Sequence, residues 1–253
     1  MSVLVLRNVD LDINELRFSD PIPNEYHGKA MYINVEHDGK RHKETLLQTP
    51  WMYNPFGLTH SMIDPNADED QQLKYYVELS FGSAPTEYVK DFHNKMKDMD
   101  TYVQEAATTN SSDWLSRPEV SDEYLQEFYK PIVRPYKNKQ KEATGEFPDM
   151  LRFKVPYYIN KDGVSFGNLE VYDASANRIE IHDIEELKTA LGRSNRVRCI
   201  VKAHSVWQSG TDFGVSWQVV RIQVLANETI GTDCMIIPSD DEEVGNNSDE
   251  EEY

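Results

Sequence analysis

The sequence feature that most constrains the fold is a pair of long alternating segments between Arg196 and Leu225, separated by the short turn sequence 209–212. In the first segment, apolar residues occupy the odd positions from Val197 to Ala203, and basic residues occupy most of the even positions. Because successive side chains of a strand point to opposite faces, the pattern predicts a long hairpin with one apolar and one cationic face. In the second segment, the apolar residues change from odd to even positions at Val219–Val220, which predicts a β-bulge and a curled sheet.

The cationic face of this hairpin is a candidate contact surface for the phosphates of a nucleic acid, whose charge Lys and Arg neutralise. An ordinary solvated hairpin face can show the same pattern, so the thirty residues alone leave both interpretations open. A polar basic loop expected at 131–149 would add further cations. The basic residues expected to contact nucleic acid are Arg193, Arg196, Arg198, Lys202 and Arg221 in or beside the hairpin, and Lys137, Lys139 and Lys141 in the loop.

Charge is strongly segregated along the sequence. The formal net charge is −18, which on its own argues against binding a polyanion. However, the last fifteen residues, 239–253, contain eight carboxylates and neither Lys nor Arg, a composition that predicts a disordered tail. The windows 130–141 and 188–202 each contain five basic residues and no acidic one. The chain is therefore expected to combine an acidic tail with local basic surfaces.

Composition and motifs favour a binding protein over an enzyme. The two cysteines do not form a disulfide framework, and no segment approaches the ~18 apolar residues of a membrane span, so a soluble intracellular protein is expected. The seven histidines are scattered, and the sequence contains no zinc, phosphate-loop or nucleophile-elbow motif. The acidic segment 64–70 fails as a calcium loop because Glu69 replaces the required Gly. We therefore predict no catalytic residue, no metal and no cofactor.

The remainder of the sequence predicts a mainly β protein with a few helices. Asp38–Gly39 is a typical hairpin turn between two candidate strands. Apolar residues spaced by three and four from Val89 to Val103 predict one helix, and Ser121 and Asp183 are positioned as N-caps of two more. The expected strands are 3–6, 29–37, 43–49, 73–81, 150–158, 169–172 and 178–181, and the expected helices are 86–107, 122–130 and 184–191.

Several aromatic side chains are candidates for stacking on nucleic-acid bases. Trp51, Tyr53 and Phe56 lie in a short segment whose two prolines disfavour a regular strand. They could stack on bases from a loop, or they could plug the end of a barrel. Trp207 has the parity of the apolar face but lies beside the turn, so both options remain open for it. Trp217 is expected in the core.

Several stretches of the sequence together resemble a known family. They are Leu191–Gly192, Val197–Cys199, Trp207, Phe213–Ser216 and Val219 in or beside the hairpin, Gln48–Met52 and Pro55–Gly57 in the aromatic segment, and the terminal SDEEEY. In these stretches the chain resembles the single-stranded-DNA-binding proteins of short-tailed phages and their relatives in the large nucleocytoplasmic DNA viruses. The helical segment 83–130 is the part that does not match, and its helices are expected to be an insertion in the β domain or to flank it.

The resemblance implies a fold, a ligand and partners. The fold is α+β and mainly β: an OB-fold, or five-stranded curled barrel, over residues 1–238, with the helical insertion at about 83–130 and the disordered tail at 239–253. The implied function is sequence-independent single-stranded-DNA binding by a homodimer in viral DNA replication, recombination or repair, in the host cytoplasm or nucleus. The tail is implied to regulate DNA binding and to recruit DNA polymerase or other replication proteins.

The tail residues implied to contact these partners are Asp249, Glu250, Glu251, Glu252 and Tyr253. The main alternative is a non-catalytic structural or interaction protein, such as a virion component or an acidic chaperone of basic partners. Salt-sensitive binding to single-stranded DNA would distinguish the first function from this alternative.

Overall fold

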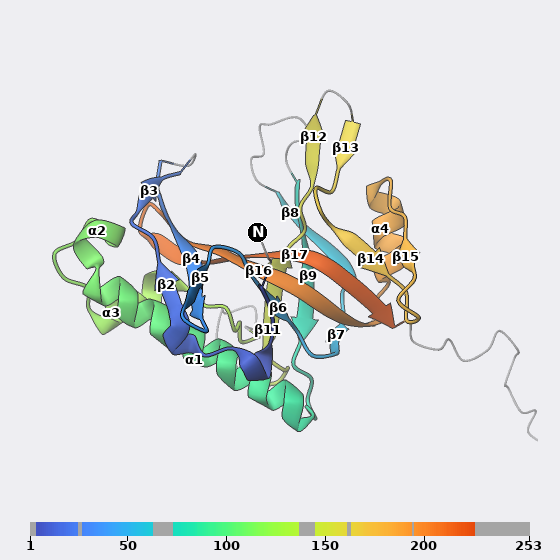
Figure 1. The fold of residues 1–253 in the computed structure, drawn as a ribbon, viewed down its shortest axis with the longest axis horizontal. Helices are drawn as coiled ribbons and strands as arrows, with labels where there is room; N and C mark the ends of the chain where they lie inside the picture. The colour runs from blue at the N-terminus through green and yellow to red at the C-terminus, as the bar shows by residue number, and fades with distance from the viewer. Residues whose placement is uncertain are drawn as a thin grey trace, which may run out of the picture.

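In the computed structural model, the described residues are 4–24, 27–62, 73–136, 145–160, 163–193 and 195–225. The predictions for Lys137, Lys139 and Lys141, and those for the tail 239–253, lie outside these residues. Within the described ranges, no helix has the length and apolar character that a membrane span requires. Strands predominate over helices, in agreement with the predicted mainly β, α+β class (Figure 1).

Five strands close a curled barrel at the centre of the molecule. They are β7 (Met52–Asn54), β9 (Leu73–Ser80), β11 (Met150–Lys154), β16 (Asn195–Ser209) and β17 (Asp212–Leu225). The strands are hydrogen-bonded in the order β7-β9-β11-β17-β16, and β16 pairs in turn with β7. The β11–β17 pair is parallel and the other four pairs are antiparallel. This closed five-stranded barrel confirms the predicted OB-fold.

The barrel interior is filled by residues that the alternation assigned to the apolar faces. Val197, Cys199 and Val201 of β16 are fully buried. Trp217 is also buried, as predicted, and its ring meets that of Phe153 edge-on with centroids 6.1 Å apart. Because these side chains fill the interior, the polar residues of the same strands are left on the outer surface of the barrel.

The β16–β17 hairpin contains the predicted bulge. Ile200 pairs with Arg221, but the next residue, Val201, pairs with Val219, so Val220 is an extra residue on β17. An extra residue reverses which side chains of the strand face the core. The change of apolar positions in the sequence therefore located this bulge correctly.

A second irregularity, which the sequence did not predict, lies at His204. This residue has no pairing partner in β17, because Ala203 pairs with Trp217 and Ser205 pairs with the adjacent Ser216. Beyond it, Val206 is fully buried whereas Trp207 is only half-buried. The bulge at His204 therefore turns Trp207 away from the core-facing side that its sequence parity indicated.

Shorter strands extend the sheet beyond the barrel. They are β1 (Leu4–Arg7), β2 (Leu16–Phe18), β3 (Ile22–Pro23), β4 (Lys29–His37), β5 (Lys40–His42), β6 (Thr45–Gln48), β8 (Leu58–Met62), β10 (Tyr129–Lys130), β14 (Glu170–Tyr172) and β15 (Arg178–Ile179). The strand β4 pairs with the distal part of β16, and β6 pairs with its middle. Asp38 and Gly39 form the predicted turn with φ angles of 50° and 68°, but the turn leads from β4 into β5 rather than directly into β6.

The single strand predicted at 150–158 is interrupted in the structure. The first part is β11, which ends at Lys154, and the second part is β12 (Tyr158–Asn160). With β13 (Gly163–Ser165), β12 forms a separate two-stranded sheet. Pro156 lies between the two parts and lacks the N–H group that a continuous ladder would require.

The helices are α1 (Glu87–Thr109), α2 (Ser111–Leu115), α3 (Asp122–Phe128) and α4 (Ile184–Leu191). The predicted apolar face of α1 is buried, and α1 runs along one side of the barrel (Figure 1). Ser121 and Asp183 are N-caps as predicted, because their side chains accept hydrogen bonds from the third backbone N–H that follows them. The helix α3, predicted over 122–130, stops at Phe128, since the next two residues form β10 beside β17.

The buried carboxylate of Asp100 ties α1 to the segment that follows α3. It accepts hydrogen bonds from the Tyr129 hydroxyl (2.6 Å) and from the backbone N–H groups of Ile132 (2.7 Å) and Val133 (3.1 Å). Burial raises the pKa of Asp100, although these hydrogen bonds oppose the shift. Since Tyr129 belongs to β10, this contact connects the helical insertion to the barrel.

Candidate nucleic-acid interface

Cationic and aromatic side chains lie together where β7 meets the start of β16. The register places Tyr53 opposite Arg196, and the guanidinium carbon lies 5.8 Å from the Tyr53 ring centroid. Two residues further along β16, the Arg198 guanidinium carbon lies 4.9 Å from the Trp51 ring centroid. These distances are typical of cation–π contacts. Four of the predicted site residues therefore form one cluster on the outer face of the barrel.

The exposure of the aromatic segment decides between its two interpretations. The side chains of Tyr53 and Phe56 are each 51% exposed, whereas the neighbouring Asn54 is fully buried. Trp51 is half-buried beside Arg198. Plugging the barrel end would require buried rings, so that interpretation is wrong for Tyr53 and Phe56.

A close backbone approach positions Phe56 and Arg193 at the same end of the barrel. A Cβ atom added to Gly57 would lie 3.3 Å from the carbonyl oxygen of Gly192, and Gly57 has a φ of 67°. The loop that bears Phe56 therefore abuts the entry to β16, directly before the exposed Arg193. A side chain at residue 57 would disturb this arrangement.

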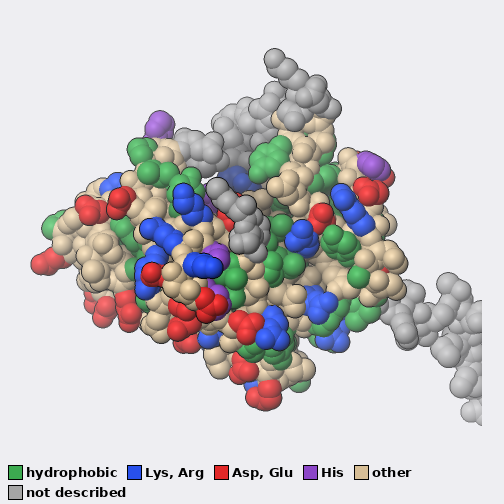
Figure 2. All heavy atoms as spheres, viewed as in Figure 1, with side chains coloured by type: hydrophobic (Ala, Val, Ile, Leu, Met, Phe, Trp, Pro, Cys, Tyr) green, Lys and Arg blue, Asp and Glu red, His purple; other side chains and the backbone are tan. Residues whose placement is uncertain are grey.

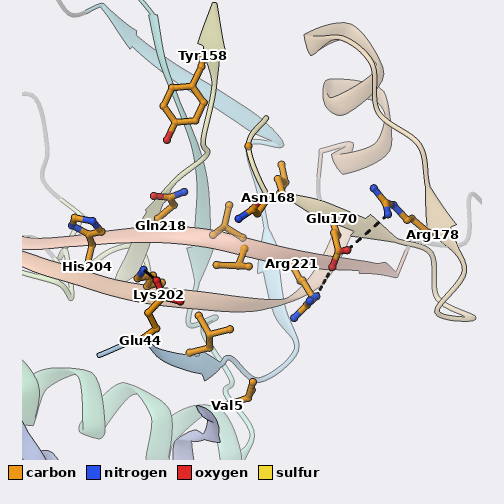
Figure 3. Close-up of a pocket in the computed structure, with 15 residues that line it drawn as sticks. Val5, Glu44, Tyr158, Asn168, Glu170, Arg178, Lys202, His204, Gln218 and Arg221 are labelled. Atoms are coloured by element: carbon orange, nitrogen blue, oxygen red, sulfur yellow. Dashed lines mark hydrogen bonds and ion pairs between the residues drawn. The ribbon is translucent and has the colours of Figure 1, made fainter. Parts of the chain in front are cut away.

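A second part of the predicted site is a groove over the middle of the β16–β17 hairpin, with a volume of about 730 Å³. Lys202 and Arg221 line it, and both form ion pairs (Figure 3). The Lys202 Nζ atom lies 2.7 Å from Glu44 Oε1, and the Arg221 Nε atom lies 2.5 Å from Glu170 Oε2. Hydrogen bonds from the two cations lower the pKa values of Glu44 and Glu170, so both carboxylates are charged at neutral pH.

His204 lies in the same groove. Burial lowers its pKa, and the nearby charges of Lys202 and Lys154 add to this effect. Its ring contacts Tyr32 edge-on, with centroids 5.3 Å apart. A neutral imidazole in this position can form hydrogen bonds with a ligand without adding charge to the groove.

The outer face of β9 and β11 contains further candidate residues that the sequence analysis missed. The Arg152 guanidinium lies 4.9 Å from the Tyr76 ring centroid and forms an ion pair with Glu78. Lys154 pairs in register with Gln218, which lines the groove, so this face is continuous with it. The strand pair β9–β11 corresponds to the second and third barrel strands, the face that OB-folds use for oligonucleotides. Alternation within each strand places these side chains on one face, but a local pattern does not show that two strands are neighbours.

The predicted residue Trp207 lies outside the groove. Trp207 is half-buried, and a Cβ atom added to Gly214 would lie 3.4 Å from its ring, so it packs against β17 rather than lining the groove. Figure 2 shows Lys and Arg side chains over the middle of the viewed face, mixed with Asp and Glu, and more acidic side chains over the helical side. In the part of the chain that the structure describes, no group of three or more His, Cys, Asp or Glu could hold a metal ion.

No protein-family model matches this sequence, and no curated protein matches it. Among solved structures, the single-stranded-DNA-binding protein of bacteriophage Enc34 in complex with single-stranded DNA is similar, with a TM-score of 0.41, 10% identity, and coverage of 84% of this chain and 98% of that chain. For gp2.5, a single-stranded-DNA-binding protein encoded by bacteriophage T7, the TM-score is 0.41 with 14% identity, and the match covers 77% of this chain and 98% of that one. Such distant similarity does not by itself assign a ligand to this chain.

Proposed function

We propose that this chain is a sequence-independent single-stranded-DNA-binding protein of viral DNA replication, recombination or repair. The main support is the alternation of cations and aromatic rings on the outer barrel surface, where Arg196 lies beside Tyr53 and Arg198 beside Trp51. Lys and Arg contact phosphates of any sequence, and aromatic rings stack on any base. Together they bind a strand without reading its sequence.

The exposed rings favour a single strand over a duplex. A base can stack on Tyr53 or Phe56 only if its face is free, which requires an unpaired and unstacked base. A duplex would offer phosphates to the cations but no base faces to the rings. Binding to duplex DNA should therefore be weaker at equal length.

The three cations of β16 provide the direct test. Replacing Arg196, Arg198 and Lys202 with Ala should weaken binding to single strands of every sequence alike. If Arg196 and Arg198 each contact one phosphate, the slope of log affinity against log salt should fall by roughly 0.7 for each of them, and by less for Lys202, because Glu44 competes for its charge. Titrations of labelled single-stranded DNA, duplex DNA and RNA over a range of salt concentrations measure both the slope and the preference.

A matched control removes exposed lysines elsewhere. Lys90 and Lys97 of α1 have side chains that are 51% and 55% exposed and do not line the groove. Their replacement with Ala should leave the salt slope unchanged. A triple variant with the wild-type slope would remove these three cations from the site, and equal binding to duplex and single strands would contradict the proposed ligand. An absence of salt-sensitive binding would favour the structural or interaction protein.

We also propose that residues 1–238 act as one DNA-binding domain with its helical insertion, and that the acidic tail 239–253 competes with DNA for the same cations. The groove supports competition by the tail, because Lys202 and Arg221 already form ion pairs with the carboxylates of Glu44 and Glu170. The tail also recruits DNA polymerase or other replication proteins through Tyr253, and the chain acts as a homodimer. The molar mass in solution and binding of the tail peptide to purified polymerase would test these last two points.

A further inference from the structure

The β12–β13 hairpin projects from the barrel beside the groove, and its base is anchored in the core. The Tyr157 ring packs edge-on against Tyr75, with centroids 4.8 Å apart, and lies 5.7 Å from that of Phe166 on the returning chain. Tyr75 and Phe166 are both buried. This aromatic group holds both ends of the hairpin, so the next residue, Tyr158, has a fixed starting point above the groove.

Tyr158 faces the groove with a largely free ring. Its side chain is 51% exposed, and it lines the same cavity as Lys202 and Gln218. Figure 3 shows the ring reaching from β12 over the groove toward Gln218. Gly167 has a φ of 58°, and a Cβ atom there would lie 3.4 Å from the ring, so the backbone of this glycine supports one side of Tyr158.

The cavity beneath the ring offers uncharged hydrogen-bonding groups. Asn168 and Gln218 both line it, and within the described ranges the structure records no hydrogen bond to either side-chain amide. An amide has both donors and an acceptor, so it can match the polar edge of any base. The volume of about 730 Å³ lies within the range of roughly 300–1,000 Å³ that is usual for small-molecule sites.

The charges around the cavity disfavour a phosphate at its centre. The charged side chains that line it are Lys202, Arg178 and Arg221, and Glu44 and Glu170. Each carboxylate is ion-paired, and Glu170 is shared by both arginines, so the three cations exceed the two carboxylates by only one charge. Carboxylates also repel a phosphate, whereas an uncharged ring meets no such barrier.

We propose that this cavity is a nucleobase site, in which an unstacked base of the bound strand lies against Tyr158 with its polar edge toward Asn168 and Gln218. This inference rests on the proposed single-strand binding and adds one position at which a base, rather than a phosphate, is held. The phosphates on either side of that base lie toward the cationic surfaces of β16 and β11.

The test compares two variants on two strands. Tyr158→Ala removes the ring, and Tyr158→Phe keeps it without the hydroxyl. The ligands are an oligothymidylate and an abasic strand of the same length and charge. Since a stacked base contributes a factor of about 5 to 150 in affinity, Tyr158→Ala should weaken oligothymidylate binding by that factor, and Tyr158→Phe should bind almost normally. Both variants should bind the abasic strand as wild type does.

Two controls separate this site from general effects. Tyr88 of α1 is 37% exposed and does not line the cavity, so Tyr88→Ala should leave both affinities unchanged. The thermal unfolding midpoint of Tyr158→Ala should match wild type, because the ring is half-exposed. Unchanged oligothymidylate binding by Tyr158→Ala, or an equal loss on the abasic strand, would overturn the nucleobase site while the proposed function stands. Failure of the wild-type protein to bind either strand would overturn the proposed function itself.

Discussion

The Lys202–Glu44 ion pair at the edge of the groove allows a direct test of whether carboxylates limit the proposed DNA binding. The charged atoms are 2.7 Å apart, and the Lys202 and Glu44 side chains are 24% and 58% exposed. A phosphate that approaches Lys202 must displace this carboxylate or share the ammonium group with it. Replacing Glu44 with Gln removes the competing charge and should therefore strengthen binding to single-stranded DNA.

The size of the effect follows from the number of counterions released. One additional phosphate contact steepens the salt slope by roughly 0.7, so the affinity ratio of Glu44→Gln to wild type should increase about fivefold for each tenfold dilution of salt. The ion pair is partly exposed and screened by solvent, so its loss should lower the free energy of unfolding by only about 0–1 kcal/mol. The pKa of Glu44 is lowered in the folded state, so this stability is present above the unfolded pKa and disappears as the pH falls through the folded pKa.

Fluorescence anisotropy with a labelled oligonucleotide, at salt concentrations between about 50 and 200 mM, measures the slope. The matched control is Glu87→Gln, which breaks the similar Lys90–Glu87 pair (2.5 Å) on α1 and should leave the slope unchanged. In a Lys202→Ala background, Glu44→Gln should have almost no effect, because the cation that it frees is absent. Identical slopes for wild type and Glu44→Gln, or a gain that persists without Lys202, would refute the competition.

Three further predictions concern the tail, the aromatic cluster and the buried carboxylate. Deleting residues 239–253 should tighten single-strand binding, most at low salt, and abolish recruitment of replication proteins in pull-down assays; equal affinities at low salt would contradict competition by the tail. Trp51→Ala should reduce affinity by about 1–3 kcal/mol with an unchanged unfolding midpoint, whereas normal affinity with earlier melting would make Trp51 a structural residue. Asp100→Asn should reduce stability by about 1–3 kcal/mol in denaturant titrations, because an amide nitrogen would face a backbone N–H of Ile132 or Val133, and DNA affinity should be unchanged. Because burial raises the pKa of Asp100, the wild-type protein should lose some stability as the pH rises from the unfolded to the folded pKa, and Asp100→Asn should lack this loss.

Local patterns were sufficient to predict the core hairpin. Alternation separates buried from outer residues within a single strand, and a change of phase, as at Val219–Val220, marks a bulge without reference to any other strand. The bulge at His204 left no such signal, because the residues around it are not alternately apolar and polar. For that reason the side of the sheet on which Trp207 lies could not be predicted.

The composition of the site depends on contacts that no local pattern contains. Glu44 and Lys202 are paired although they are far apart in the sequence, and the same holds for Glu170 and Arg221. Both pairs form because short strands outside the barrel, β6 and β14, align with the hairpin. The basic face predicted from β16 was therefore identified correctly as a row of residues, but its charge was overestimated.

The distribution of charge over the fold explains how a chain with a net charge of −18 could bind a polyanion. The helical segment 87–128 contains ten Asp and Glu residues against four Lys and Arg. Met99 of α1 contacts the same small cavity as Ala203 and Trp217, whereas the adjacent Lys202 and Gln218 line the groove on the opposite face of the hairpin.

At about 0.1 M salt, charges are screened beyond about 10 Å, so a strand in the groove would respond to the nearby cations and hardly to the helices behind the sheet. At about 0.01 M salt the screening length increases to about 30 Å, and repulsion by the acidic helical side should reach the strand. The gain in affinity on dilution should therefore level off at very low salt, and making the exposed acids of α1 neutral should remove this plateau without changing affinity at 0.1 M.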